Sequence, residues 1–359
     1  MQQDKQERLD QVSIVSTTEI LVALKKMDQL NKKLLAIVDD GRYRGILSAG
    51  DIQRAIIANQ PLETPVIDVI RQTVRVASAD DEFDDIKSMM IQHRTEFMPV
   101  LNQEDQLIDI HFWEDVFADR LPAKKRFDIP VVIMAGGKGT RLKPISDILP
   151  KALFPLGEKT IVENIMDRFT EAGCHRFFMS VSHKADFIES YFAQTDCPGR
   201  SIEFFRETKP LGTAGSLQLI QDRVKERFFV SNCDIIVDTD YSEILDYHVQ
   251  HKNKITLVAA LRHVKIPYGT LDTAEEGRLL RIAEKPEYTH LINAGLYLLE
   301  PELLSLIPED DFFHITDLID EVMKQEERVG VFPVSEKSWL DIGQWNEYER
   351  SMKTLASKL

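Results

Sequence analysis

The chain has 359 residues, of which 43% are hydrophobic and 29% charged, and its formal net charge at pH 7 is −15. This length allows two or three domains, and the acidic balance argues against broad nucleic-acid or membrane binding because no basic surplus exists to neutralise phosphates. Cys174, Cys197 and Cys233 form no C-x-x-C pair, which favours a reducing compartment over a disulfide framework. The polar start and the lack of an apolar run of about 20 residues predict a cytoplasmic protein with no membrane partner.

The sequence begins with a polar segment, residues 1–11, which we expect to be a solvated tail. A weak internal repeat follows, with one copy at 12–68 and a second at 69–121. Each copy reads as helix, strand, turn, strand and helix, and Asp51 and Asp115 stand at equivalent places. This arrangement resembles a tandem pair of CBS domains and implies a small α/β module.

The first copy contains the ligand-binding motif of CBS domains, G-h-x-[ST]-x-x-D, from Gly45 to Asp51. The resemblance implies an adenosine nucleotide, with Asp51 at the ribose hydroxyls and Ser48 near a phosphate. The second copy has Asp109 and Phe112 at the glycine and serine positions, and both are poor neighbours for a phosphate. The pair is therefore either a nucleotide sensor or a scaffold that joins chains into a homo-oligomer, since a fold does not fix a function.

A polar segment, residues 122–128, predicts a linker to a larger second part, residues 129–359. In that part, apolar runs of strand length alternate with amphipathic runs of helical length, which predicts a Rossmann-like, doubly wound α/β sheet with a mixed extension. Ligands of such sheets bind beyond the carboxyl ends of the strands. We expect helices at 161–172, about 185–194 and about 213–225, and strands at 129–135, 176–182, 201–205, 227–232, 254–261, 278–284, 291–299 and 329–334.

The first of these strands runs into a glycine-rich loop, MAGGKGTRLKPISDILPKALFPLG, at residues 134–157. Glycine lets a backbone approach a ligand closely, and consecutive N–H groups in such a turn form an anion-binding concavity. Arg141, Lys143 and Lys151 add cationic side chains that suit phosphate. The loop therefore predicts a phosphate site, although an ordinary glycine turn with solvated cations is the alternative.

Two better-known phosphate loops are excluded by single positions. A P-loop requires Lys and then Ser or Thr after its last glycine, whereas Thr140 and Arg141 follow Gly139. A dinucleotide fingerprint requires a third glycine where this chain has Leu142.

The strings AGGKGTRLKP (residues 135–144) and PKAL (residues 150–153) resemble the signature of sugar-1-phosphate nucleotidyltransferases, with Ala152 where that family usually has Pro. The resemblance implies that Arg141 favours the departing pyrophosphate and that Lys151 bridges the sugar phosphate and the α-phosphate. It also implies nucleotide contacts from the first part of the loop: Ala135, Gly136, Gly137, Gly139 and Thr140.

Two aspartates are candidate metal ligands. Asp234 follows an apolar strand at its carboxyl end, where a carboxylate facing phosphates suits Mg²⁺. The family has N-x-D at this point and W-x-D-I/V-G around the position of Asp341, so the resemblance implies that both aspartates hold Mg²⁺. The alternatives are helix caps, with Asp234 capping the next segment and Asp341 capping a helix near Gly343.

Further segments resemble the base and sugar sites of the family. ETKPLGTAG, residues 207–215, resembles the base-recognition segment, which implies nucleotide contacts from Glu207, Gly212 and Thr213 and is similar in style to guanylyltransferases. Its alternative is a turn and helix start capped by Thr213. A Tyr-Gly turn, a Glu-Lys-Pro turn and an Asn-x-Gly strand imply sugar contacts, although each alone could be an ordinary turn: Tyr268, Gly269, Glu284, Lys285 and Asn293.

A CBS pair in front of this catalytic type resembles the guanylyltransferases of bacterial legionaminic acid pathways, which implies GTP and glucosamine 1-phosphate as substrates. The alternatives are a mannose- or heptose-phosphate guanylyltransferase and an inactive, adenylate-sensing regulatory protein. No strong general base is needed, because a phosphomonoester with a second pKa of about 6 is largely dianionic at neutral pH. Catalysis then consists mostly of positioning and charge stabilisation.

Overall fold

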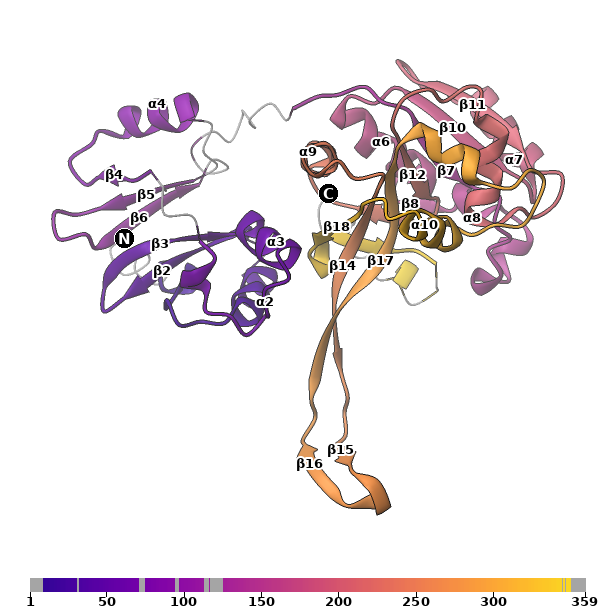
Figure 1. Ribbon diagram of the computed structural model, residues 1–359. Helices are drawn as coiled ribbons and strands as arrows, with labels where there is room; N and C mark the ends of the chain where they lie inside the picture. Colours follow the sequence, from indigo (N-terminus) through magenta and orange to yellow (C-terminus); the bar gives the residue numbers. More distant parts are fainter. Residues whose placement is uncertain are drawn as a thin grey trace. The chain divides into compact units, whose positions relative to one another are not determined.

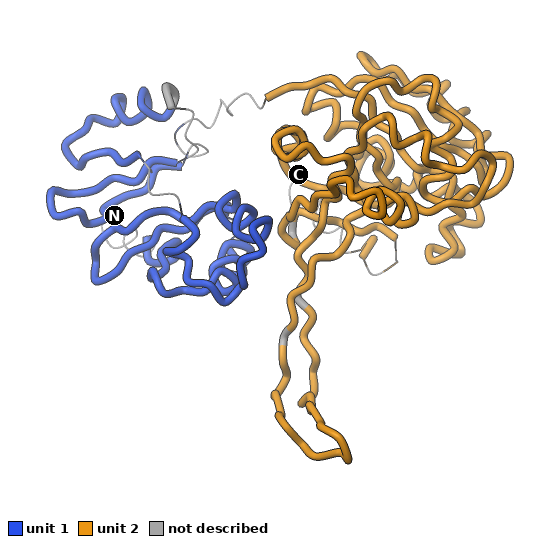
Figure 2. The backbone as a smooth tube through the Cα atoms, viewed as in Figure 1, with its two compact units in different colours: residues 1–123 blue, residues 124–359 orange. Residues whose placement is uncertain are grey.

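The computed structural model describes residues 9–30, 32–70, 75–93, 97–112, 116, 125–343, 345 and 347–349. The chain divides into two compact units, residues 1–123 and 124–359 (Figure 2). Leu9 is buried in the core of the first unit, contrary to the expectation of a solvated tail up to residue 11.

The first unit contains two small sheets with the same topology, β1-β2-β3 and β4-β5-β6. In each sheet the first strand pairs parallel with the second, and the second pairs antiparallel with the third. The internal repeat is therefore visible in the strand order, although Asp115 lies outside the described residues. The elements are β1 (Ser13–Ile14), α2 (Ile20–Leu30), β2 (Leu34–Asp39), β3 (Arg42–Ser48), α3 (Ala49–Ile57), β4 (Ala77–Ser78), α4 (Phe83–His93), β5 (Phe97–Leu101) and β6 (Leu107–Phe112).

The second unit is built on a seven-stranded sheet in the order β11-β10-β7-β12-β17-β14-β18 (Figure 1). Four neighbouring strands are parallel, β17 is antiparallel to both of its neighbours, and β18 is parallel to β14. This arrangement confirms the doubly wound α/β sheet with a mixed extension. The strands are β7 (Val131–Met134), β10 (Arg176–Val181), β11 (Ser201–Arg206), β12 (Phe228–Asn232), β14 (Ile255–Lys265), β17 (Glu287–Leu299) and β18 (Val329–Val334).

Helices cover both faces of this sheet, as the alternation of side chains along β12 shows. Phe229 packs against Phe169 of α6 and Tyr241 of α9, with ring centroids 5.3 and 5.8 Å away. Its neighbours Phe228 and Val230 point to the other face and share a core with α10. The helices are α6 (Ile161–Ala172), α7 (Ala185–Gln194), α9 (Tyr241–His251) and α10 (Ile315–Lys324), and none in the described part of the chain is long and apolar enough to cross a membrane.

The expected helix at about 213–225 is wrong in its length. The structure has a single turn, α8 (Gly212–Gly215), followed by a 3₁₀ segment, Ser216–Ile220. The backbone of residues 311–313 presses on this segment, because a Cβ on Gly212 would lie 2.5 Å from the Phe313 carbonyl oxygen. A tertiary contact therefore overrides the local helical pattern.

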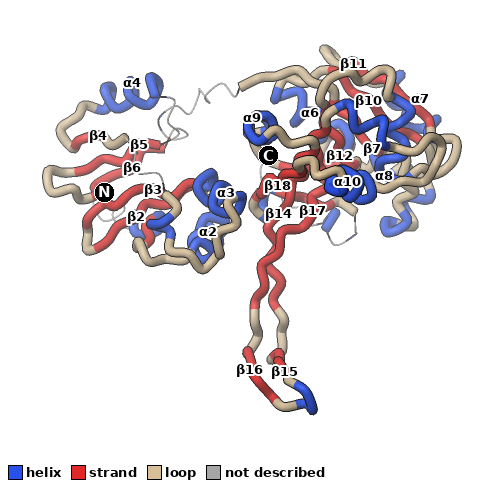
Figure 3. Tube along the Cα trace, viewed as in Figure 1, coloured by secondary structure: helices blue, strands red, loops and turns tan. Residues whose placement is uncertain are grey.

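Strands β14 and β17 continue beyond the sheet as a two-stranded ribbon, whose tip is formed by β15 (Thr270–Thr273) and β16 (Leu279–Ala283) (Figures 1 and 3). We call residues 264–291 the arm. The strand expected at 278–284 is thus present, but it pairs with β15 in the arm and does not extend the main sheet.

Candidate functional site

The glycine-rich loop begins after β7, at the carboxyl end of a central strand. The Ala135 amide donates to the Ser180 carbonyl at 2.9 Å before the loop turns away from the sheet. Gly139 then adopts φ +61°, and a Cβ there would lie 3.3 Å from the Cβ of Lys151. A left-handed residue with a Cβ costs about 1 kcal/mol, so this position favours glycine both by conformation and by space. The loop is therefore shaped to pack over Lys151.

Lys151 connects the loop to the first candidate metal ligand. Its side chain is only 8% exposed, and its Nζ forms an ion pair with Oδ2 of Asp234. Lysine is rarely buried unless it is paired. Because the two residues are 83 positions apart, the fold of the sheet brings the loop and the carboxylate together.

The second aspartate reaches the same place through a short antiparallel pair. Strand β13 (Ile235–Val237) pairs with β19 (Trp339–Asp341), with Ile235 opposite Asp341. The Ile342 amide also donates to the Asp234 carbonyl at 2.7 Å. These two contacts hold Asp234 and Asp341 side by side.

Gly343 lies where three of the predicted side chains converge. A Cβ on this glycine would lie 2.7 Å from Oδ1 of Asp341, 3.3 Å from Oδ2 of Asp234 and 3.4 Å from a guanidinium nitrogen of Arg141. From the sequence, Gly343 was expected only near the start of a helix. The signal for its role was its position directly after Asp341 and Ile342 in the W-x-D-I-G string.

The helix-cap alternatives are decided differently for the two aspartates. Oδ1 of Asp341 accepts a hydrogen bond from the Gly343 amide at 2.7 Å, so this residue shapes the following turn as well as facing Asp234. The side chain of Asp234 contacts Lys151, and the following helix α9 is capped by Asp240, whose Oδ1 accepts from the Ser242 amide at 2.9 Å.

The two carboxylates fit Mg²⁺ that shares its ligands with a triphosphate. Mg²⁺ usually takes one or two carboxylates together with phosphate oxygens, and this is the donor set that Asp234 and Asp341 offer. Across the described ranges, no group of three or more His, Cys, Asp or Glu side chains is placed to hold a metal ion by itself. Cys233 is buried beside Asp234, and burial, then the neighbouring carboxylate, raises the pKa of its thiol to about 12. The thiol is therefore protonated at neutral pH and is a poor nucleophile.

The predicted base-recognition segment borders the glycine-rich loop. Glu207 accepts hydrogen bonds from the Ser180 hydroxyl at 2.6 Å and from the Leu211 amide at 3.2 Å. A Cβ on Gly136 would lie 2.6 Å from Oε1 of Glu207, so this carboxylate lies against the loop. The Thr213 hydroxyl accepts from the Ile315 amide at 2.9 Å and thus fixes the start of α10 instead of capping its own helix.

The predicted sugar residues fall into two groups. Asn293 is in β17, where its Nδ2 donates to the Tyr297 hydroxyl at 2.7 Å. Two residues further on, a Cβ on Gly295 would lie 2.6 Å from the side chain of Asn232, which places this strand beside the carboxylates. The other group is in the arm: Tyr268, Gly269, Glu284 and Lys285.

The members of the arm group lie close to one another and project beyond the sheet. A Cβ on Gly269 would lie 3.1 Å from Oε2 of Glu284, and Tyr268 is 74% exposed. All of them lie between Lys265 and Glu287, which form the last residue pair of the β14–β17 ladder. The structure therefore assembles these residues with each other and leaves them outside the carboxylate cluster.

In the first unit, Ser48 and Asp51 form the capping box of α3. The Ser48 hydroxyl accepts from the Asp51 amide at 3.2 Å, and Oδ2 of Asp51 accepts from the Ser48 amide at 2.8 Å. Asp51 is 3% exposed, and its other oxygen forms an ion pair with Arg54. Both predicted ligand residues thus have a local structural role.

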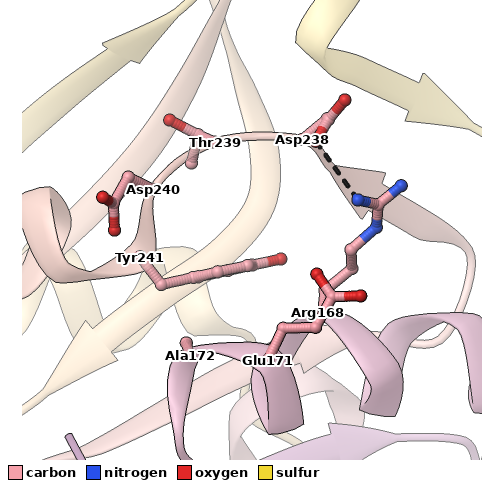
Figure 4. Close-up of a pocket in the computed structure, with 7 residues that line it drawn as sticks. All are labelled: Arg168, Glu171, Ala172, Asp238, Thr239, Asp240 and Tyr241. Carbon is pink, nitrogen blue, oxygen red and sulfur yellow. Dashed lines mark hydrogen bonds and ion pairs between the residues drawn. The ribbon is translucent and has the colours of Figure 1, made fainter. Parts of the chain in front are cut away.

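A small pocket at the other end of β13 from Asp234 is shown in Figure 4. Asp238 forms an ion pair with Arg168 at 3.3 Å there, and the buried Tyr241 hydroxyl donates to the Val237 carbonyl at 3.0 Å. These partners belong to the packing of α6 and α9, so we interpret the pocket as part of the scaffold.

Comparisons with known proteins agree with this arrangement. Residues 130–358 match the family model described as nucleotidyl transferase, and residues 9–58 match the model described as CBS domain. A mannose-1-phosphate guanylyltransferase catalytic subunit beta of Drosophila pseudoobscura pseudoobscura is 30% identical over 234 residues, which are 64% of this chain and 62% of that protein. A mannose-1-phosphate guanyltransferase of Kluyveromyces lactis is 34% identical over 236 residues, covering 60% and 62%.

Among solved structures, HddC from Yersinia pseudotuberculosis superimposes with a TM-score of 0.51 and 26% identity, covering 63% of this chain and 99% of HddC. Another structure of HddC, with the same TM-score, is a complex with GMP-PN. The chain spans about 62% of the length of the curated relatives named above.

Proposed function

The chain belongs to the nucleotidyl transferase family, and from that premise we propose that it transfers GMP from GTP to a sugar 1-phosphate and releases pyrophosphate. One observation carries the proposal: two cationic and two acidic side chains from separate segments meet at one edge of the sheet. They are Arg141, Lys151, Asp234 and Asp341. This combination suits a triphosphate bound together with a divalent cation.

The proposed reaction is a single in-line displacement. An oxygen of the sugar phosphate attacks the α-phosphorus, a new P–O bond forms, and the bond to the β-phosphate breaks so that pyrophosphate leaves with the electron pair. The exposed guanidinium of Arg141 can hold the leaving pyrophosphate at two oxygens, which stabilises the charge that develops there. Because Lys151 already contacts Asp234, its ammonium group is within reach of ligands that this carboxylate holds.

We propose Asp234 and Asp341 as the residues that hold Mg²⁺. When bound, the ion would supply Lewis-acid charge withdrawal at the α-phosphate. The glycine-rich loop would contribute backbone N–H groups to the triphosphate, and the turn at Gly139 would keep this backbone close to Lys151.

The choice of GTP is supported by the guanylyltransferase names of the curated relatives and by the GMP-PN complex of HddC. For the sugar, two candidates have separate support. The resemblance in domain arrangement, a CBS pair in front of the catalytic part, favours glucosamine 1-phosphate, whereas the names of the curated relatives favour mannose 1-phosphate. We propose that the sugar and its phosphate are contacted by Asn293 and by the arm group described above, which includes Tyr268 and Lys285.

The test is pyrophosphate release with Mg²⁺ across five nucleoside triphosphates and a panel of sugar 1-phosphates that includes glucosamine, N-acetylglucosamine, mannose, glucose and a heptose. We expect release with GTP and one member of the panel. Release with another triphosphate would support the proposed reaction and contradict the choice of GTP. No release from a folded sample that still binds GTP would favour the inactive, adenylate-sensing alternative.

A further inference from the structure

Two aromatic residues shortly after Asp341 contact the glycine-rich loop. The Trp345 indole donates through Nε1 to the Lys143 carbonyl at 3.0 Å, across 202 positions of the sequence. The Tyr348 hydroxyl donates to the Pro155 carbonyl at 2.6 Å, across 193 positions. One short stretch that follows a candidate metal ligand therefore holds the loop at two of its backbone carbonyls.

The two aromatic rings also pack against each other and against the end of the loop. Trp345 and Tyr348 are both in helical conformation, and residues three apart on a helix are neighbours. Their ring centroids lie 5.8 Å apart at 69°, and the Tyr348 ring meets that of Phe154 at 6.0 Å, again edge to face. This is a favoured geometry for aromatic pairs. Because Phe154 is buried, the contact ties both rings to the packed end of the loop.

The beginning of the same stretch is fixed at the carboxylates. Ile342 is fully buried, and its amide donates to the Asp234 carbonyl at 2.7 Å. Three residues earlier, the Trp339 indole donates to the Ala294 carbonyl of β17 at 3.2 Å. The stretch thus contacts β17, the carboxylate cluster and the glycine-rich loop in turn, so it can set the distance between the loop and the carboxylates.

We infer that Trp345 is a positioning residue, which holds the loop so that Arg141 faces the two carboxylates. This role rests on the proposed function, whereas the anchoring of the loop does not. Arg141 stands two positions before Lys143, and the intervening Leu142 is fully buried. The backbone next to Arg141 is therefore held twice, by the packing of Leu142 and by the indole hydrogen bond at Lys143. A guanidinium on a backbone fixed in this way meets the departing pyrophosphate with little reorganisation.

The alternative is a tether that stabilises the fold and has no effect on the reaction. The two roles separate when the indole N–H alone is removed. Trp345→Phe keeps an aromatic ring and loses the donor, since the indole nitrogen is the only hydrogen-bonding group of this side chain. A tether would then cost stability only, whereas a positioning residue would also change the turnover that depends on Arg141.

The anchoring is tested by hydrogen exchange of the full chain, measured by mass spectrometry on peptides that cover residues 134–157. In Trp345→Phe we expect the amides of Leu142 and Asp147, which are hydrogen-bonded within the loop, to exchange about five- to tenfold faster. The matched control is Tyr241→Phe, which removes an aromatic hydrogen bond to a backbone carbonyl in the scaffold and should leave exchange in the loop unchanged. Unchanged exchange in Trp345→Phe would overturn the anchoring.

Tyr348→Phe gives a second reading that does not depend on the folding of the first variant. It removes the hydroxyl that holds Pro155, so the neighbouring amide of Phe154 should exchange about five- to tenfold faster. Exchange at the wild-type rate would overturn the anchoring at this end of the loop.

The positioning role is tested by steady-state kinetics of pyrophosphate release. Trp345→Phe should lower kcat about tenfold and change the KM for GTP less than about twofold, because a misplaced guanidinium loses the contact that strengthens as pyrophosphate leaves. In an Arg141→Lys background the same substitution should lower kcat less than about threefold, since both residues act through one contact. Equal losses in the two backgrounds would overturn action through Arg141. If the wild-type enzyme releases no pyrophosphate, the proposed function fails, but the exchange result still decides the anchoring.

Discussion

Two aspartates that follow strands, Asp51 in the first unit and Asp234 in the second, have opposite surroundings. Two partners of Asp51, Ser48 and Arg54, are three residues away on either side, so the helix terminus engages this carboxylate locally. The partner of Asp234, Lys151, is 83 residues away, and Asp341 and Arg141 reach it from other segments. A carboxylate that only caps a helix needs no such assembly. Bringing charges together from distant segments therefore indicates a ligand site more strongly than a matching local motif does.

The largest expected effect is at the assembled site. Asp234→Asn should reduce pyrophosphate release on the order of 10²–10³-fold, because it removes a charge that would act directly at the reacting phosphate. Thermal unfolding should remain cooperative. The control is Asp246→Asn, which breaks an exposed ion pair with Lys125 and should leave turnover near that of the wild type. Near-normal turnover in Asp234→Asn would show that Asp234 has no role in the reaction.

A smaller effect is expected when the charge at the loop is kept. Arg141→Lys should lower the rate about 10- to 100-fold, because an ammonium group cannot hold two phosphate oxygens as a guanidinium does. Steady-state kinetics should show the loss in kcat more than in the KM for GTP, since the contact is proposed to strengthen as pyrophosphate leaves. If GTP affinity fell 10- to 100-fold while kcat stayed unchanged, Arg141 would contribute only to binding of GTP in the ground state.

The first unit should respond mainly in stability. Asp51→Ala removes half of the capping box of α3 and leaves Arg54 without this partner, so we expect a loss of about 1–2 kcal/mol in unfolding free energy. Turnover without added adenylate should be unchanged. Calorimetry with AMP, ADP and ATP separates the two roles, because adenylate binding that Asp51→Ala abolishes would make the motif a ligand site as well as a cap.

The smallest effect concerns the thiol beside Asp234. Since burial raises the pKa of Cys233 to about 12, its thiolate is scarce at pH 8, and iodoacetamide should modify the less buried Cys197 first. The thiolate fraction grows about tenfold for each pH unit below that pKa, so labelling should accelerate towards pH 10. Mass spectrometry of peptides measures both sites, and rapid labelling of Cys233 at pH 8 would show that the site opens to solvent.

Much of the fold was predictable because local chemistry and tertiary packing agree. The helix at 161–172 begins with the capping box of Thr160 and Glu163 and ends at Gly173, which has φ +107°. The parallel order of the central strands followed from alternating segments. The predicted helix at about 213–225 failed because Gly212 and Gly215 face the backbone of residues 311–313, a contact that no local pattern reveals.

The candidate site was predictable in its residues and only partly in its geometry. Motifs identified Asp234 and Asp341, but the pairing of β13 with β19 that joins them depends on the whole fold. Motifs also identified Tyr268 and Lys285, whereas their place on a projecting arm could not be read from them. A motif specifies the type of chemistry, whereas the path of the strand that carries it depends on the whole fold.

The central claim is that Asp234 and Asp341 hold a divalent cation together with GTP. We would measure it by water-proton relaxation with Mn²⁺ as the probe, in the presence of GTP, on the wild-type protein and on Asp341→Asn. The account predicts enhanced relaxation for the wild-type complex and an affinity for Mn²⁺–GTP at least tenfold weaker in the variant. Equal affinity in the two proteins, both folded, would contradict it.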